Sequence, residues 1–174
     1  MPSPSPVTPT SSEAIASDAT EPLEWARVVQ VLAGAQTFWL ATTRGGERPP
    51  HVRPVLAVAH GGSIWSTSSL AARKAHNLQH HPRSTISTSD DDIDLVVEAA
   101  VRRVTDAPTL EQIAAVYREK YGWPPVVQGD QYDAPYGAPT AGPPPYALFE
   151  HRPTAVWAFG TTEGYWSRAT RFHF

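Results

Sequence analysis

The chain has 174 residues, 41% hydrophobic and 18% charged, which is the composition of one ordinary globular domain. A formal net charge of -3 gives no general basic surface, so nucleic acid is not an expected partner. The absence of cysteine excludes disulfides, thiolate metal sites and cysteine nucleophiles. No apolar run is long enough to span a membrane, and the N-terminus lacks the pattern of a signal peptide. We therefore expect a cytoplasmic protein without a membrane partner.

The N-terminal part divides into a tail and a first helix. Residues 1–19 are rich in Pro, Ser and Thr, so burial cannot offset their ordering entropy, and we predict a disordered tail before a domain over 20–174. A helix is expected next, with Thr20 as its N-cap, Pro22 in its first turn and Gly34 at its end. Its apolar residues recur at helical spacing: Trp25, Val28, Val29 and Leu32.

A series of β-strands is predicted next, with paired glycines at its turns. Residues 37–43 are β-forming, and Gly45-Gly46 supplies the turn after them. Residues 51–60 alternate between two faces, as expected of one strand. Gly61-Gly62 makes a hairpin turn into a further strand over 63–69.

The middle of the chain predicts a short helix over 70–81, ended by Pro82, and a strand over 83–89. The Asp-rich residues 90–92 fit a hairpin turn and lack the ligand spacing of a calcium loop. The strand after this turn has the clearest alternation in the chain. One face carries Ile93, Leu95, Val97, Ala99 and Val101, and the other carries Asp94, Glu98 and Arg102.

The last third contains a second long helix and two further strands. A capping box at residues 109–112 opens the helix, and Gly122 ends it. Residues 123–145 form a Pro-, Gly- and Tyr-rich loop that is either functional or disordered at this length. Strands are expected over 146–160 and 169–174. Several strands with few helices predict a mainly β fold, a β-barrel with α-helical additions.

The junction between a strand and a helix at residues 66–74 carries the strongest chemical signal. A helix N-terminus offers unpaired N–H groups and a positive dipole end, which suits a phosphate. Hydroxyl residues precede the helix, and Arg73 and Lys74 add a planar fork and a point charge. Lysine occurs only here and at Lys120. The same residues also fit a capped surface helix with two solvated cations.

A second signal is Arg53, a cation within a strand of β-branched residues. Such a cation is usually exposed at an edge or paired. It can instead neutralise an anion beside the same pocket as the junction. The backbone after it can meet the polar edge of a flat heterocycle, although Pro54 has no N–H to give.

The order of these segments resembles a known family. The matching pieces are FWLATT, PPHVRPVLAV, IWSTSS, ARKAHNL, HHPRSTIST, DLVVEAAVRRVTD, YREKYGW, GAPTAGPPPY and the terminal TRFHF. In this order, residues 21–174 are similar to the pyridoxamine-phosphate-oxidase-like family of FMN- and deazaflavin-binding split β-barrels. The resemblance implies an FMN-binding split β-barrel that is homodimeric, with two cofactor sites that both protomers build.

The resemblance also implies the cofactor-binding residues. The isoalloxazine-type ring is expected to lie against Arg53, Pro54, Val55 and Leu56. The residues that touch the ring or the ribityl chain are Ser66, Thr67 and Ser68, and those that bind the phosphate are Arg73 and Lys74. The C-terminal residues near the ring are Thr170, Arg171 and Phe172, and the residues that stack from the partner chain are Trp157 and Phe159.

Two positions depart from the family pattern. Members with a well-formed phosphate site often carry a hydroxyl residue just before the Arg-Lys pair, where this chain has Ala72. The loss of one charge-assisted hydrogen bond costs on the order of 1.5–3 kcal/mol, which weakens binding without abolishing it. Many relatives also have Gly where this chain has Ala99, a difference that affects packing.

Other residues each allow two interpretations. His76 and His80 have a spacing that zinc can use, but no third ligand is evident, so surface histidines are favoured. Tyr132, Tyr136 and Tyr146 either form a lid over a planar substrate or attach a proline-rich loop to the barrel.

These features predict a flavoprotein oxidoreductase that transfers a hydride to or from a small planar substrate. FMN is the expected cofactor and a deazaflavin coenzyme the alternative. No catalytic dyad is evident, and Arg53 and Arg171 are the candidates for holding an anionic substrate or stabilising reduced flavin. A non-catalytic flavin or haem binder with the same fold is a second hypothesis. A barrel without a cofactor is a third, because of Ala72.

Overall fold

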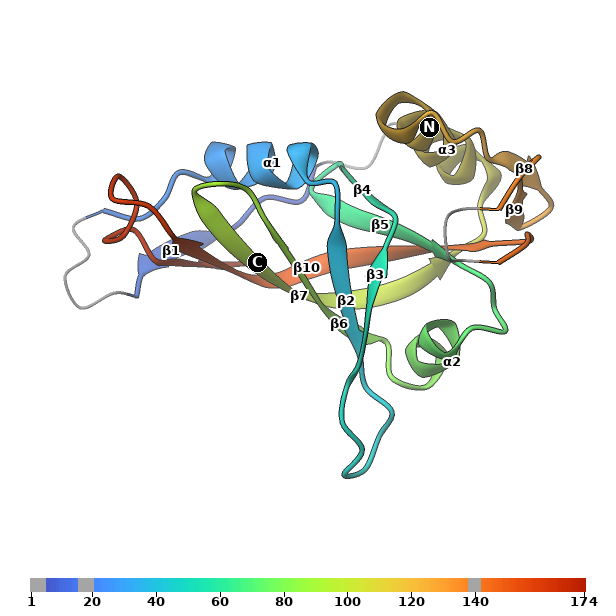
Figure 1. Cartoon of the computed structure of the whole chain (residues 1–174), viewed down its shortest axis with the longest axis horizontal. Coiled ribbons are helices and arrows are strands. Elements are labelled where there is room, and N and C mark those ends of the chain that lie inside the picture. Colours follow the sequence, from blue (N-terminus) through green and yellow to red (C-terminus); the bar gives the residue numbers. More distant parts are fainter. Residues whose placement is uncertain (1–5, 16–20, 138–141) are drawn as a thin grey trace.

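The computed structural model describes residues 6–15, 21–137 and 142–174. These residues form a curled antiparallel β-sheet that is accompanied by helices (Figure 1). The helices are α1 (Trp25–Gly34), α2 (Arg73–His80) and α3 (Ala107–Tyr121). The strands are β1 (Ser11–Ala14), β2 (Phe38–Thr42), β3 (His51–Val55), β4 (Ala57–His60), β5 (Ser63–Ser68), β6 (Arg83–Ser89), β7 (Ile93–Val104), β8 (Val126–Gln128), β9 (Gln131–Asp133), β10 (Ala147–Gly160) and β11 (Thr170–His173). Within the described residues, no helix is both long and apolar enough to cross a membrane.

One nine-stranded sheet carries the fold, and β8 and β9 form a separate hairpin. The main path runs β1-β11-β10-β7-β6-β2-β3, while β4 and β5 branch from it because β5 pairs with β10. β10 therefore has two neighbours along one edge, with β5 beside Ala147–His151 and β11 beside Ala155–Ala158. Its register with β7 shifts between Pro153 and Ala155, where proline has no N–H for the ladder. This arrangement confirms the predicted mainly β split barrel.

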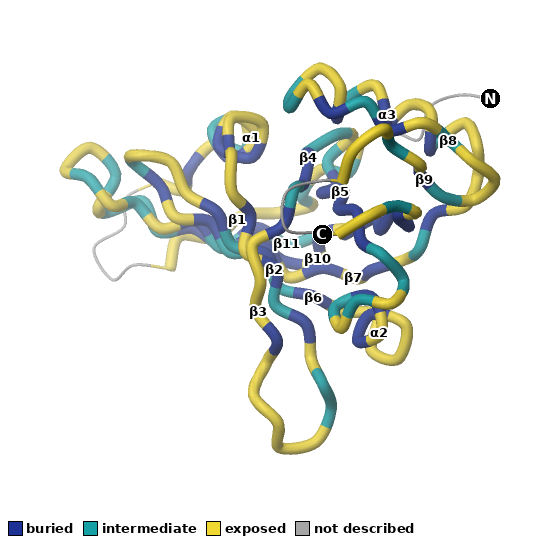
Figure 2. The backbone as a smooth tube through the Cα atoms, turned by 45° about the vertical axis from the view of Figure 1, so that its right-hand side comes forward, coloured by how far each residue is buried: buried dark blue, intermediate teal, exposed yellow. Residues whose placement is uncertain are grey.

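The alternation of apolar residues along β7 builds the main core, as the sequence predicted. Ile93, Leu95 and Val97 are buried, whereas Asp94 and Glu98 are exposed. The core also includes apolar residues of α1, β2, β6 and β10, and Figure 2 shows the buried positions concentrated in the sheet. The hairpin turn predicted over residues 90–92 joins β6 to β7, whose last paired residues are Ser89 and Asp94.

Helix α3 covers a second core. The apolar residues buried beneath it include Leu110, Ile113, Trp123 and Leu148. The predicted end of this helix is confirmed, because Gly122 has a left-handed φ of 63° and donates its N–H to the carbonyl of Arg118. The helix start was predicted wrongly.

Both long helices begin at different residues from those expected. Asp106 is the N-cap of α3, because its carboxylate accepts a hydrogen bond from the backbone N–H of Thr109 at 3.0 Å. Thr109 therefore lies inside the first turn and opens no capping box. Helix α1 begins at Trp25 with Glu24 at its N-cap, and Thr20 lies outside the described residues.

The single strand predicted over residues 51–60 is interrupted at Leu56. β3 before this residue pairs with β2, whereas β4 after it pairs with β5. The residue types on the two sides of Leu56 show no break, so the sequence pattern cannot reveal a change of pairing partner. The corner at Leu56 therefore places β3, which pairs with β2, next to β4, which pairs with β5.

The prediction of a disordered tail over residues 1–19 is wrong for residues 11–14. They form β1, which pairs with β11 in antiparallel register from Ser11 opposite His173 to Ala14 opposite Thr170. All four side chains are exposed, and the strand is held by backbone hydrogen bonds and by contacts of Glu13 with Arg171 and His173, which residue composition does not report. Residues 1–5 and 16–20 lie outside the described residues.

The loop predicted over residues 123–145 contains regular structure. β8 and β9 form a hairpin, and Tyr132 pairs with Tyr146 in an isolated bridge. The hydroxyl of Tyr132 donates to the carbonyl of Leu110 at 2.6 Å, and that of Tyr136 to the carbonyl of Gly122 at 3.3 Å. These contacts attach the segment to α3. Residues 138–141 lie outside the described residues.

Candidate functional site

The N-terminus of α2 supplies the first part of the site. The helix begins at Arg73, three residues later than expected, and its N-cap Ala72 offers no side-chain hydrogen bond. The hydroxyl of Ser69 accepts from the N–H of Ala71 at 3.3 Å instead, before the helix starts. The first turn contains no acidic residue. Its N–H groups and the positive end of the helix dipole are thus available to an anion.

A cluster of basic groups surrounds this helix start. Burial lowers the pKa of Lys74, and the nearby charge of Arg53 lowers it further. Burial likewise lowers the pKa of His51, with further contributions from Arg53, Arg44, Lys74 and Arg73. These effects require the five groups to lie close together. We refer to Arg44, His51, Arg53, Arg73 and Lys74 as the basic cluster.

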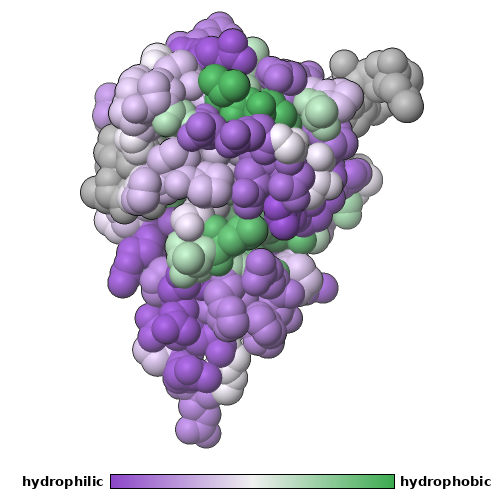
Figure 3. All heavy atoms as spheres, turned by 90° about the vertical axis from the view of Figure 1, so that its right-hand side faces the viewer, coloured by the Kyte–Doolittle hydropathy of each residue, from purple (hydrophilic) through white to green (hydrophobic). Residues whose placement is uncertain are grey.

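The basic cluster has no acidic counterpart. Among the described residues, none of its members forms an ion pair. The Nε of Arg44 and the Nδ1 of His51 are buried without a hydrogen-bond partner. Unpaired buried polar groups cost free energy, and like charges add repulsion, so this arrangement favours a bound anion. The end of the molecule that carries α2 and α3 is largely hydrophilic, with separate apolar areas (Figure 3).

The structure brings Arg53 to the predicted phosphate residues. Arg53 is exposed on β3 and donates to the carbonyl of Val52 at 2.7 Å. Pro54 is exposed beside it, whereas Val55 is buried and Leu56 is half-buried. The predicted ring-lining segment therefore runs from the basic cluster to the corner between β3 and β4.

The three hydroxyl residues of β5 are buried and have partners within the protein. The Oγ of Ser66 lies 2.8 Å from Nε2 of His151. The Oγ of Ser68 donates to the carbonyl of Ser69 at 3.1 Å. The hydroxyl of Thr67 hydrogen-bonds to Tyr117, whose pKa burial raises well above its ordinary value. A ligand that contacts β5 would meet its backbone groups, unless the three hydroxyls exchanged their hydrogen bonds within the protein for hydrogen bonds to the ligand.

His151 is a buried polar residue that the sequence did not reveal. Its two ring nitrogens lie 2.8 Å from the hydroxyls of Ser66 and Ser84, so the neutral imidazole joins β5, β10 and β6. Complete burial lowers the pKa of His151 to about 3. A single histidine in an apolar strand carries no spacing signal, because its partners lie on other strands.

The predicted C-terminal residues lie several strands away from β3 in the order of the sheet. Cross-strand partners share a sheet face, and one such row runs across the sheet through Pro54, Trp39, Ser87, Val96, Trp157 and Arg171. At about 4.8 Å per strand step, Trp157 and Arg171 lie roughly 19 and 24 Å from Pro54 along the sheet. Among the described residues, the side-chain contacts of Trp157 and Arg171 are with each other and with Glu13, and none of these belongs to the basic cluster.

The C-terminal residues make their own local contacts. The guanidinium of Arg171 lies 4.6 Å from the ring centroid of Trp157 and 3.7 Å from the carboxylate of Glu13 on β1. Thr170 is buried and accepts from the N–H of Leu23 at 2.8 Å. Phe172 is also buried, in the main core. Trp157 and Arg171 are half-buried, and Phe159 is exposed.

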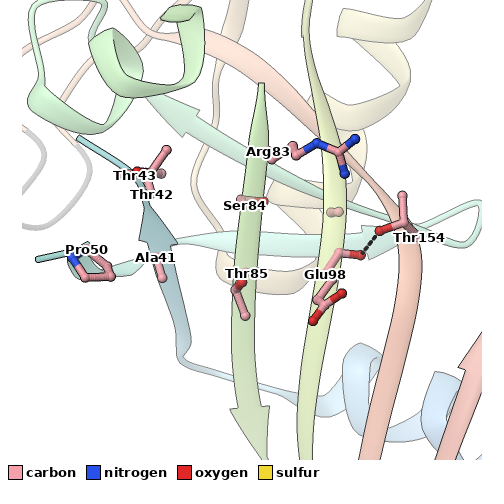
Figure 4. Close-up of a pocket in the computed structure, with 10 residues that line it drawn as sticks. Ala41, Thr42, Thr43, Pro50, Arg83, Ser84, Thr85, Glu98 and Thr154 are labelled. Carbon is pink, nitrogen blue, oxygen red and sulfur yellow. Dashed lines mark hydrogen bonds between the residues drawn. The ribbon is translucent and has the colours of Figure 1, made fainter. Parts of the chain in front are cut away.

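A cavity of about 300 Å³ lies on the face of β2, β6, β7 and β10 (Figure 4). It is lined by Ala41, Thr42, Thr43, Pro50, Arg83, Ser84, Thr85, Glu98, Ala99 and Thr154. None of these belongs to the predicted cofactor residues, and the predicted packing role of Ala99 agrees with its burial. Its rim at Thr43 and Pro50 adjoins Arg44 and His51 in sequence.

The histidines of α2 form no described metal site. The rings of His76 and His80 lie 4.4 Å apart, and Nδ1 of His80 lies 2.9 Å from the carbonyl oxygen of His76. No three His, Asp or Glu side chains gather as metal ligands in the part of the chain that the structure describes.

The topology and the basic cluster define a split β-barrel that can hold an anionic ligand. The chain belongs to the pyridoxamine 5'-phosphate oxidase family, because the family model of that description matches residues 25–160. No curated protein matches the chain.

Solved structures share the fold. A conserved hypothetical protein from Mycobacterium tuberculosis has a TM-score of 0.61 at 17% identity, covering 83% of this chain and 88% of that one. An FAD-binding protein from Mesorhizobium loti has a TM-score of 0.54 at 12% identity, covering 87% and 95%. An F420 reductase has a TM-score of 0.51 at 22% identity, covering 73% and 93%. At these identities the likeness establishes the fold alone.

Proposed function

We propose that this protein is a cytoplasmic flavin-dependent oxidoreductase that binds FMN at a homodimer interface. The reaction is hydride transfer to or from a small planar substrate. The observation that carries the proposal is the basic cluster, in which three arginines, one lysine and a buried histidine gather without an acidic partner among the described residues. Family membership supports the flavin-type ligand.

The residues present fit a phosphorylated cofactor. The phosphate would be held by Arg73, Lys74 and the first-turn N–H groups of α2. Two further polar atoms, the Nε of Arg44 and the Nδ1 of His51, are buried and unpaired beside them. Arg44 and His51 compensate for the missing hydroxyl at Ala72. FMN, when bound, supplies the hydride chemistry, and the protein contributes orientation and electrostatics.

A second copy of the chain would complete the site. Trp157 and Arg171 share a sheet face with Pro54 but lie several strands away from it. The same face carries exposed apolar side chains, including Trp39 and Phe159, which are 50% and 39% exposed. A twofold dimer that packs these faces together buries the apolar groups and brings Trp157 and Arg171 of one protomer toward β3 of the other.

The chain's own residues then have distinct roles. Arg53 holds an anionic group between the phosphate site and the ring-lining segment. Arg171, ordered by Trp157 and Glu13, would approach β3 from the second protomer on the sheet face that carries Pro54. Both guanidiniums orient an anionic substrate or stabilise negative charge.

The basic cluster also favours a second candidate, a deazaflavin-dependent reductase. Arg44 and Arg53 add two permanent charges to the Arg-Lys pair, more than one phosphate needs. A deazaflavin coenzyme with an anionic polyglutamate tail would use this surplus. The F420 reductase among the structural neighbours shares the fold. A non-catalytic flavin or haem binder is distinguished by stoichiometric reduction without turnover.

An absorption spectrum of the purified protein, followed by fluorescence titrations with FMN and with the deazaflavin coenzyme, tests the proposal. Tight binding of FMN with turnover of a reduced nicotinamide supports the main function, and preference for the deazaflavin supports the second candidate. Binding of neither contradicts both. Light scattering tests the dimer, and a monomer at micromolar concentration would contradict it.

A further inference from the structure

Lys120 occupies an unusual position beside the ring-lining segment. The last turns of α3 are fastened to the corner between β3 and β4 by two hydroxyls: Tyr117 donates to the carbonyl of Leu56 at 3.1 Å, and Tyr121 to that of Ala57 at 2.7 Å. Lys120 belongs to the same turns of α3. Its Nζ is 5.0 Å from the ring centroid of Phe38, which pairs in register with Val55, and 5.2 Å from that of Tyr121.

The ammonium group of Lys120 is desolvated and unpaired. Its Nζ is inaccessible to solvent and has no hydrogen-bond partner, and among the described residues no carboxylate forms an ion pair with it. Burial lowers the pKa of Lys120 to about 8, so the group remains mostly protonated at pH 7. The two aromatic rings offset part of the desolvation. A methionine of similar length would fill the space without this cost.

Lysine is rare in this chain, so the buried position of Lys120 is not one of many lysine positions. The two lysines, Lys74 and Lys120, both have pKa values lowered by burial, whereas twelve of the fourteen basic residues are arginines. One lysine lies at the start of α2 beside Arg53, and the other lies beside Phe38, which pairs with Val55. The proposed ring-lining segment thus has a cation at each end.

We propose that the Lys120 ammonium stabilises the negative charge that a flavin-type ring acquires on reduction and so raises the reduction potential of the bound cofactor. The proposal rests on the function proposed above. Addition of a hydride from a donor such as a reduced nicotinamide gives a neutral ring one negative charge. Lys120 acts on this charge through space and needs no contact with the ring, because a desolvated cation in a low-dielectric wall acts over several ångströms.

The expected effect is a change in preference for the reduced ring. Lys120→Met should leave the affinity for oxidised FMN almost unchanged and weaken that for reduced FMN by about 10–100-fold. At about 30 mV per tenfold for two electrons, the potential of bound FMN should fall by roughly 30–60 mV. The apo-protein should be at least as stable in urea at pH 7, since the substitution removes a buried unpaired charge.

Two further variants make the test specific. Lys120→Arg retains a charge and should retain most of the potential. Arg118→Met is the matched control, because it removes an exposed cation from the same helix and should leave both the affinity for FMN and the potential unchanged. An equilibrium reduction with a redox dye measures the potential independently of turnover.

The outcomes separate the two proposals. If wild-type protein binds FMN and Lys120→Met has the wild-type potential, Lys120 is a structural residue and this inference is wrong, while the proposed function stands. If Lys120→Met unfolds more readily than wild type, the reduction potentials of FMN bound to Lys120→Arg and to Lys120→Gln are compared instead. Equal potentials in these two variants overturn the inference. If wild-type protein binds no flavin, the proposed function fails and the inference fails with it.

Discussion

Two buried histidines of this protein have opposite surroundings. His151 lies where three strands meet, and each of its ring nitrogens has a serine hydroxyl at 2.8 Å. His51 lies at the start of β3, where its Nδ1 is buried without a partner and the neighbouring charges are all positive. Burial lowers the pKa of both. The polar atoms of one imidazole are paired within the protein, whereas Nδ1 of the other has no hydrogen-bond partner among the described residues.

The difference separates structural polar residues from ligand-binding ones. A buried polar group with all its partners inside the chain contributes to the stability of the fold. A buried polar group without partners lowers stability until a ligand supplies them. Changes around His151 should therefore alter unfolding, and changes in the basic cluster should alter binding.

The largest expected effect is on binding. Arg73→Ala combined with Lys74→Ala should weaken FMN binding by about 10²–10⁴-fold, because each charge-assisted hydrogen bond contributes about 1.5–3 kcal/mol. The free energy of unfolding should change by less than about 1 kcal/mol. Fluorescence titration and urea unfolding measure the two quantities. Arg118→Ala, which removes an exposed cation of α3, is the control, and an unchanged affinity in the double variant would contradict the comparison.

The next effect is on stability. His151→Leu should lower the free energy of unfolding by about 2–4 kcal/mol, because the hydroxyls of Ser66 and Ser84 remain buried without their partner. Urea unfolding at pH 7 measures the loss. His80→Leu, on the exposed side of α2, should change stability by less than about 0.5 kcal/mol. Equal effects of the two substitutions would show that the buried network contributes nothing.

The buried imidazole also predicts a pH dependence. Folded His151 has a pKa of about 3, below the ordinary value of 6.5, so the unfolded chain binds the extra proton between these pH values. Stability should therefore fall as pH decreases from 6.5, by about 2 kcal/mol between pH 7 and pH 5. His51 contributes in the same direction.

Urea unfolding of wild type and His151→Leu at pH 7 and pH 5 measures how much of the loss of stability on acidification comes from His151. The variant should lose less stability than wild type on acidification. The lowered pKa values of Asp90 and Asp106 act only at lower pH, below about 4. Parallel losses in the two proteins would mean that His151 is not the responsible group.

The smallest expected effect is at His51. His51→Leu should change the free energy of unfolding by less than about 1 kcal/mol, and a gain is expected because an unpaired buried nitrogen is removed. Urea unfolding in phosphate-free buffer measures it. A loss as large as that of His151→Leu would show that both histidines are structural and would remove the contrast.

The sequence predicted the parts of the fold that depend on local patterns. Alternation in β7, the turn over residues 90–92 and the cap at Gly122 follow from neighbouring residues. The break at Leu56 was missed, because the residue types show no interruption there, whereas the pairing partner changes from β2 to β5. Strand β1 was missed because its stabilisation comes from a backbone edge about as distant in sequence as the chain allows.

The part of the candidate site that depends on a local pattern was predictable from the sequence, and the part assembled by folding was not. Arg73 and Lys74 follow from charge at a helix start, and the structure places Arg53 beside them. Arg44 and His51 carry no sequence signal, because folding of the β2–β3 hairpin brings them to the cluster. The partners of His151 likewise come from two other strands.

The pairing of β1 with β11 has a consequence for handling the protein. β1 buries almost no side chain, yet it occupies a hydrogen-bonding edge that would otherwise be open. An open edge strand is a template for pairing with other molecules. A chain truncated before residue 15 would keep its core and its basic cluster and would lose protection against aggregation, so the N-terminal strand is a solubility element.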